Sequence, residues 1–164
     1  MPEQFVPDKN KGKNVDLEHH VDCRTKKEAD DLYEMAVGRL KTPEQWSLLP
    51  GTTRTRFSLV KTNHDGKFIQ EGDYIRIDVP GPGPSDGSGY DYVQIAALIE
   101  EMPDDGRVRK TGIKLRPSSD PDSKSEKVAH FFDEQSSSSL LISQDGQRIG
   151  QFFNERRTVV RAVA

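Results

Sequence analysis

GDYIRIDVPGPGPSDGSGYDYVQIAALI, residues 72–99, is the stretch that decides the fold of this 164-residue chain. Residues 74–79 and 90–99 both alternate between apolar and polar side chains, with a Pro/Gly-rich loop between them. Period-two alternation predicts two antiparallel strands, each with one face buried. The side chains predicted to enter the core are Ile75, Ile77 and Val79 on the first strand and Val93, Ile95, Ala97 and Ile99 on the second.

The opposite faces of these strands form the candidate binding surface. Antiparallel pairing would gather aromatic rings, a cation, a carboxylate and an amide on one face, a combination that suits a protein partner or the wall of a cleft. The plainer interpretation is a set of surface ion pairs between Arg76 and Asp78, worth about 1 kcal/mol at most. The candidate residues on the two strands are Tyr74, Arg76, Asp78, Tyr90, Tyr92 and Gln94.

His130 is a further candidate binding residue, because it lies inside the apolar run of residues 128–132. A histidine in such a strand is more often structural than catalytic when no nucleophile motif accompanies it. We therefore expect no catalytic residue. The glycines of residues 80–89 do not form a phosphate cradle, since three prolines lack the N–H group and no Lys-Ser/Thr pair follows. This loop is predicted to be a semi-rigid, partly polyproline-like connection, and no cofactor is expected.

The rest of the chain predicts an α+β domain. Thr25 and Glu28 form a capping box ahead of a helical apolar stripe that extends to Leu40, and residues 42–48 predict a second, short helix. Asp145-Gly146 predicts a tight hairpin. We expect both helices to pack on a curved antiparallel sheet or partial barrel of about seven strands. The strand candidates are residues 53–60, 74–79, 90–99, 108–116, 128–132, 138–143 and 148–154.

Residues 1–21 are polar and predict a flexible N-terminal arm, which leaves residues 22–164 as a single domain. Within this domain, residues 117–127 predict a polar surface loop. The hydrophobic fraction is only 32% and the mean hydropathy is −0.78, so a modest core is expected.

Composition excludes several classes of protein. Cys23 is the only cysteine, which rules out an intrachain disulfide, and neither a signal peptide nor a membrane span is evident. The 24 basic and 27 acidic residues are mixed along the chain, which makes nucleic-acid binding unlikely. His19, His20 and Cys23 lack a second ligand pair at zinc spacing, so no metal site is expected. A cytoplasmic protein that contacts no membrane is the expectation.

Four segments together resemble a family of small, single-domain, uncharacterised bacterial proteins. They are residues 72–83 (GDYIRIDVPGPG), 89–93 (GYDYV), 115–117 (LRP) and 129–132 (AHFF). The resemblance covers roughly residues 20–157 and implies a single bacterial domain without a known activity. At the level of fold, the order of helix, Trp46 after a Thr-Pro turn, and strand series is similar to START and polyketide-cyclase domains. Those domains need a long C-terminal helix, which residues 155–164 are too few to form.

The expected function is therefore that of a non-catalytic cytoplasmic module that binds another protein through residues 74–94. The alternative is a small-molecule-binding domain or enzyme with a cavity between helix and sheet. A pocket of about 300 Å³ or more, lined by Tyr74, Arg76, Tyr92 and His130, would favour that alternative.

Overall fold

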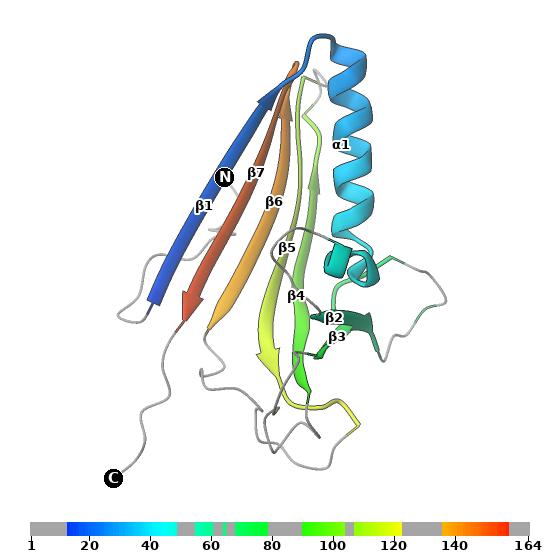
Figure 1. Cartoon of the computed structure of the whole chain (residues 1–164), viewed down its shortest axis with the longest axis vertical. Helices are drawn as coiled ribbons and strands as arrows, with labels where there is room; N and C mark the ends of the chain where they lie inside the picture. Colours follow the sequence, from blue (N-terminus) through cyan, green and yellow to red (C-terminus); the bar gives the residue numbers. More distant parts are fainter. Residues whose placement is uncertain are drawn as a thin grey trace.

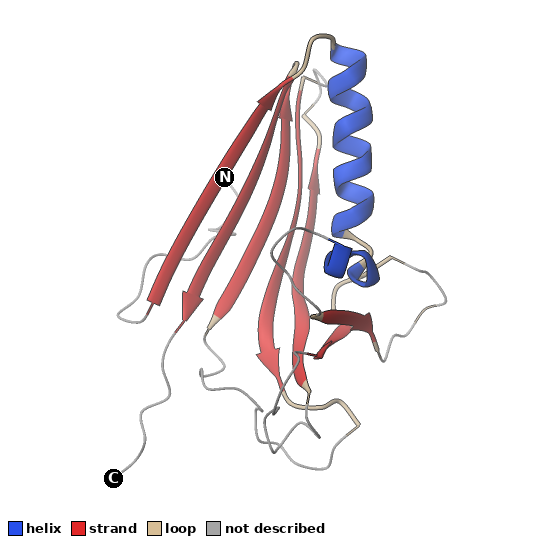
Figure 2. Cartoon of the chain, viewed as in Figure 1, coloured by secondary structure: helices blue, strands red, loops and turns tan. Residues whose placement is uncertain are grey.

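A computed structural model describes residues 13–48, 55–60, 64, 68–78, 90–103, 107–122 and 136–157. Its centre is a seven-stranded antiparallel sheet with one α-helix lying along one face (Figures 1 and 2). The sheet is open, in the order β1-β7-β6-β5-β4-β3-β2, so the expected α+β class is confirmed and the described strands do not close into a barrel. The strands are β1 (Lys13–Asp22), β2 (Arg56–Leu59), β3 (Tyr74–Asp78), β4 (Asp91–Glu101), β5 (Val108–Ser118), β6 (Ser137–Asp145) and β7 (Arg148–Arg157).

The helix α1 (Lys26–Leu40) begins at the predicted capping box. Thr25 is extended, and its side chain accepts a 3.1 Å hydrogen bond from the backbone N–H of Glu28. The Glu28 carboxylate in turn accepts from the backbone N–H of Arg24 at 3.1 Å. These bonds satisfy N–H groups that have no partner within the helix. The side chains that α1 buries follow helical spacing and are Ala29, Tyr33, Val37 and Leu40.

The second predicted helix is a 3-10 helix, η1 (Pro43–Leu48), and not an α-helix. Trp46 still enters the core as expected: its indole N–H donates to the backbone carbonyl of Arg39 at 3.0 Å, and its ring meets Phe57 edge to face at 5.4 Å. Each of the five strands β3 to β7 contributes one isoleucine to the core between the helices and the sheet. These residues are Ile75, Ile95, Ile113, Ile142 and Ile149.

The N-terminal region differs from the expected flexible arm. Residues 13–22 form β1, which pairs with β7 along its whole length, from Lys13 opposite Arg157 to Asp22 opposite Arg148. The sequence of β1 is charged because the strand lies at the sheet edge, so few of its side chains enter the core. Leu17, on the helix side, is 61% exposed. The alternation of Val15, Leu17 and Val21 with charged residues is a strand signal that the expectation of a flexible arm overlooked.

A second correction concerns β4. The register between β4 and β5 shifts between Ile95 and Ala97, where a β-bulge inserts an extra residue. Val93, Ile95 and Leu98 face the core, and the bulge turns Ala97 and Ile99 to the other side. The expected burial of Ala97 and Ile99 on the core face is therefore wrong, because a bulge reverses the alternation beyond it.

The predicted hairpin at Asp145-Gly146 joins β6 to β7. Asp145 pairs with Arg148, so the two loop residues are Gly146 and Gln147, one position later than expected. Gly146 has a φ of 60°, a conformation that glycine adopts without strain. The predicted loop at 80–89 and the strand candidate at 128–132 lie outside the described residues, as do residues 123–127 of the predicted polar loop. The first two residues of that loop, Pro117 and Ser118, instead end β5.

Candidate functional site

The candidate binding residues of β3 and β4 lie on the face of the sheet that points away from α1, which we call the outer face. Tyr74 pairs with Gln94 and Arg76 pairs with Tyr92 across the two strands. The guanidinium carbon of Arg76 lies 4.6 Å from the centre of the Tyr90 ring, a cation–π contact. The structure thus places five of the predicted residues side by side.

The sixth strand residue, Asp78, ends β3 opposite Arg56 of β2 on the same face. Tyr92 is only 6% exposed, so it supports the surface more than it presents a contact. Burial raises the pKa of the Tyr92 hydroxyl, and the nearby Asp120 carboxylate raises it further. His130, the seventh candidate, lies outside the described residues. The other five candidates on the two strands are half-buried and make up the accessible part of this surface: Tyr74, Arg76, Asp78, Tyr90 and Gln94.

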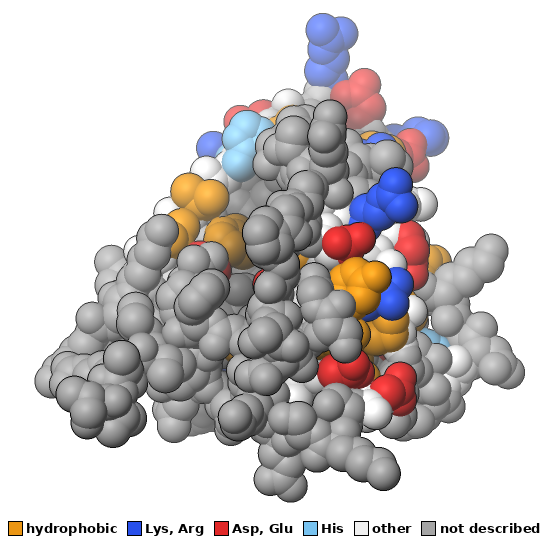
Figure 3. Space-filling model, turned by 60° about the horizontal axis from the view of Figure 1, so that its bottom comes forward, with side chains coloured by type: hydrophobic (Ala, Val, Ile, Leu, Met, Phe, Trp, Pro, Cys, Tyr) orange, Lys and Arg blue, Asp and Glu red, His pale blue; other side chains and the backbone are white. Residues whose placement is uncertain are grey.

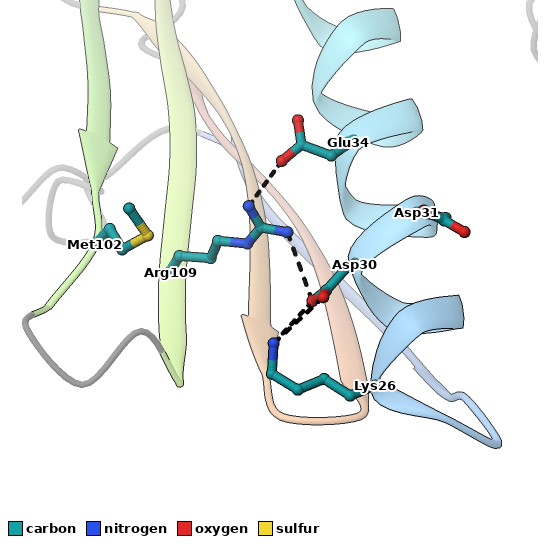
Figure 4. Close-up of a pocket in the computed structure, with 6 residues that line it drawn as sticks. All are labelled: Lys26, Asp30, Asp31, Glu34, Met102 and Arg109. Carbon is teal, nitrogen blue, oxygen red and sulfur yellow. Dashed lines mark hydrogen bonds and ion pairs between the residues drawn. The ribbon is translucent and has the colours of Figure 1, made fainter.

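A separate, open groove of about 310 Å³ lies at the N-terminal half of α1, facing β5 (Figure 4). Its lining differs from the one predicted for a ligand cavity and consists of Lys26, Asp30, Asp31, Glu34, Met102 and Arg109. Arg109 donates to the Glu34 carboxylate at 2.7 Å, and the Lys26 ammonium lies 3.1 Å from the Asp30 carboxylate. The charges in the groove are thus largely paired with one another.

Beneath the groove, Gln144 connects the helix to the sheet. Its side chain is 2% exposed; the carbonyl oxygen accepts from Arg109 Nε at 2.7 Å, and the amide donates to Asp30 Oδ1 at 2.7 Å. The Arg109 guanidinium also stacks on the Tyr33 ring at 4.0 Å, and the Tyr33 hydroxyl is 2.7 Å from Thr111 Oγ1. These contacts make the groove part of the interface between α1 and the sheet.

The electrostatics of the groove agree with a structural role. The hydrogen bond from Gln144 holds the pKa of the Asp30 carboxyl below its usual range, with the Lys26 ammonium as the second cause. Asp30 is therefore an ionised acceptor and a poor proton donor near neutral pH. Within the described ranges, no group of three or more His, Cys, Asp or Glu side chains is arranged to hold a metal ion.

His64 and Asp73 form a pair that the sequence did not reveal. His64 Nε2 is 2.7 Å from Asp73 Oδ2, and the same oxygen accepts from the backbone N–H of Gln70 at 2.7 Å. Asp73 is 4% exposed and follows the turn that ends at Gly72, whose φ is 92°. An aspartate ahead of a strand is too common a pattern to predict such a contact.

The Gln144 network and the β4 bulge were also missed. Gln144 belongs to a polar segment near the predicted hairpin, where a buried amide leaves no distinct signal. The alternation of β4 gave no sign of the extra residue, because Ala96, Ala97 and Leu98 are apolar in either register. Contacts between elements far apart in sequence set both features.

Comparison with known proteins adds no family to this description: neither the scan against family models nor the search of the curated proteins gave a match. The resemblance to a bacterial family stays a prediction. Among the described helices, none combines the length and apolar character needed to cross a membrane.

Proposed function

We propose that this chain is a non-catalytic, cytoplasmic bacterial module that binds another protein through the outer face of β3 and β4. The observation that carries the proposal is the alignment of Tyr74, Arg76 and Tyr90 on one face, opposite the helix. Tyrosine and arginine are the residue types that most often dominate binding energy at protein interfaces. The Arg76–Tyr90 contact also holds the two side chains in one arrangement before binding, which lowers the entropy lost on association.

The packing between α1 and the sheet favours this proposal over a ligand cavity at that place. The isoleucine core fills the space below the helix, and the described groove is lined by paired charges of both signs. The visible described surface in Figure 3 likewise carries acidic and basic side chains next to one another. Such mixing gives no broad basic footprint for nucleic acid.

The test is affinity capture from a lysate of the source organism, followed by binding measurements between the purified partners. Substitution of two neighbouring residues of β3, Tyr74→Ala with Arg76→Ala, should weaken binding at least about tenfold, as loss of central contacts does. Tyr92 is left unchanged, because its substitution would disturb the fold. The matched control is Lys27→Ala with Asp31→Ala, an exposed ion pair on α1.

The control variant should bind the purified partner as the unchanged chain does. Equal binding by the Tyr74/Arg76 variant would show that the partner uses another surface. Failure of the unchanged chain to retain any protein under conditions in which it is folded would also contradict the proposal.

A further inference from the structure

The outer face of β5 and β6 holds a polar cluster that the proposed function does not use. Lys114 on β5 lies directly opposite Ser139 on β6. Directly opposed residues have Cβ atoms about 5 Å apart and point to the same side of the sheet. Arg116 follows two residues along β5 and therefore projects to this side as well.

Ser139 is the unusual member of this cluster. It is 1% exposed, and its hydroxyl is the one buried side-chain polar atom in the described part of the chain that makes no hydrogen bond. A buried hydroxyl without a partner is costly, and most native structures avoid it. The hydroxyl can donate to an acceptor that enters the cluster.

The two cations beside Ser139 also lack a counter-charge. No ion pair among the described residues involves Lys114 or Arg116, and the residues opposite Lys114 on the two neighbouring strands, Ala97 and Ser139, are uncharged. Burial lowers the pKa of the Lys114 ammonium, and the like charge of Arg116 lowers it further. An anion placed between the two side chains would favour the charged form of Lys114 and so oppose both effects.

Arg156, on the same face of the sheet, is a cation whose charge is paired within the chain. It is 6% exposed, and its guanidinium lies 2.8 Å from the Asp16 carboxylate while Nη1 donates to the backbone carbonyl of Glu155 at 3.0 Å. The chain thus supplies a carboxylate for the most buried arginine of this face. At Lys114 and Arg116 that negative charge must come from a bound group.

We propose that Lys114, Arg116 and Ser139 form a binding site for a phosphate group. Arginine and lysine donate charge-assisted hydrogen bonds to phosphate oxygens, and a serine hydroxyl supplies a third, neutral donor. Arg116 is exposed, so the site opens to solvent on its side. The inference goes beyond the proposed function and does not depend on it, since it involves different strands and needs no protein partner.

The test is a titration of the purified full chain with inorganic phosphate. Binding is measured by the changes in amide chemical shifts in NMR spectra and, separately, by calorimetry. Shifts should concentrate at Lys114, Arg116 and Ser139. Lys114→Gln should weaken phosphate binding about tenfold, the usual scale for the loss of one charge-assisted bond. Ser139→Ala should also weaken it, by a smaller factor.

Two features of the variants keep the result interpretable. Ser139→Ala removes a hydroxyl that has no partner, so the variant should unfold at the same or a slightly higher temperature without phosphate. Lys110→Gln removes a charge from the same strand and face but opposite Ser143, and should leave binding unchanged. No phosphate binding by the unchanged chain, or equal binding by all four proteins, would overturn the proposal. Neither of these two results depends on whether the chain captures a protein partner, so this test can fail or succeed separately from that of the proposed function.

Discussion

Gln144 shows how one residue can join two layers of this molecule. Its amide donates to Asp30 on α1 and to the backbone carbonyl of Gly146, while its carbonyl oxygen accepts from Arg109 on β5. Both ends of the side chain are therefore used, and the site is almost fully buried. An amide is the one uncharged side chain that can donate and accept at these positions simultaneously.

Replacing Gln144 tests this role. Gln144→Leu keeps the approximate volume but leaves Arg109 Nε and the Asp30 carboxylate without their shared partner. We expect the free energy of unfolding to fall by about 1 to 3 kcal/mol, measured by urea denaturation. Gln147→Leu, in the exposed turn, is the control and should change stability by less than about 0.5 kcal/mol. A Gln144 variant as stable as the unchanged chain would mean that the network contributes nothing.

Asp30 makes stability depend on pH at the acidic end. Its folded-state pKa lies below the usual value of 3.8, first because of the bond from Gln144 and then because of Lys26. The stabilisation is therefore fully present well above pH 3.8 and is lost as the pH falls through the lower, folded-state pKa. Asp30→Asn should reduce the loss of stability between neutral and acidic pH. NMR titration of the Asp30 carboxyl measures its pKa in the folded protein. A pKa at or above 3.8 would contradict the predicted contribution of Asp30 to stability.

At the scale of the elements, the capping box sets where α1 begins. Thr25→Ala removes the acceptor for the N–H of Glu28 and should lower the free energy of unfolding by about 1 kcal/mol. Thr25→Ser keeps a hydroxyl at the same place and should retain most of that stability. Urea unfolding of both variants compares them, and equal losses would show that the hydroxyl is not what stabilises this end.

The β6–β7 hairpin has a close approach that only glycine allows. A Cβ added at Gly150 would lie 2.8 Å from Ser143 Oγ and 2.9 Å from the Phe152 ring, which folds back over the glycine. Gly150→Ala should therefore destabilise the protein by about 1 to 3 kcal/mol. Combining it with Phe152→Ala should cost less than the sum of the two changes, because the clash with the ring is then removed and only that with Ser143 Oγ is left. Strict additivity in thermal or urea unfolding would show that the ring is not responsible.

Elements whose apolar pattern coincides with buried positions were the easiest to predict from the sequence. The helix, its cap, the β6–β7 hairpin and the alternation of β3 all carry local signals, and each lies close to its expected place. The first strand also alternates, with Val15, Leu17 and Val21 on one face, but that face stays largely exposed and the strand is held by pairing with β7, from the far end of the sequence. The bulge in β4 has no local signal. Both depend on long-range contacts that a single sequence does not display.

The same limit applies to the candidate site. Alternation was sufficient to place Tyr74, Arg76 and Gln94 on one face, because a strand repeats every two residues. It did not indicate that Tyr92 would be buried, since the burial of a residue on the outer face depends on what lies over it. Nor did it join Lys114 to Ser139, because strand register is decided by the turns and by the core.

At the scale of the whole molecule, the short edge strand β2 should be less stable than the middle of the sheet. β2 has four residues, each paired on one side with β3, whereas β6 is paired on both sides along nearly its whole length. Amide hydrogen exchange should therefore be fastest in β2 and slowest in β5 and β6. Equal protection of β2 and β6 would show that the sheet opens only as a unit.

The position of β1 has a consequence during synthesis on the ribosome. This strand ends at Asp22, yet the strand it pairs with begins at Arg148, close to the end of the sequence. At a synthesis rate of ~5 to 20 residues per second, β1 leaves the ribosome roughly ten seconds before β7 and waits that long for its partner. Its charged side chains keep it solvated during that interval, when an apolar edge would invite pairing with other chains. The charged residues of β1 thus protect the nascent chain.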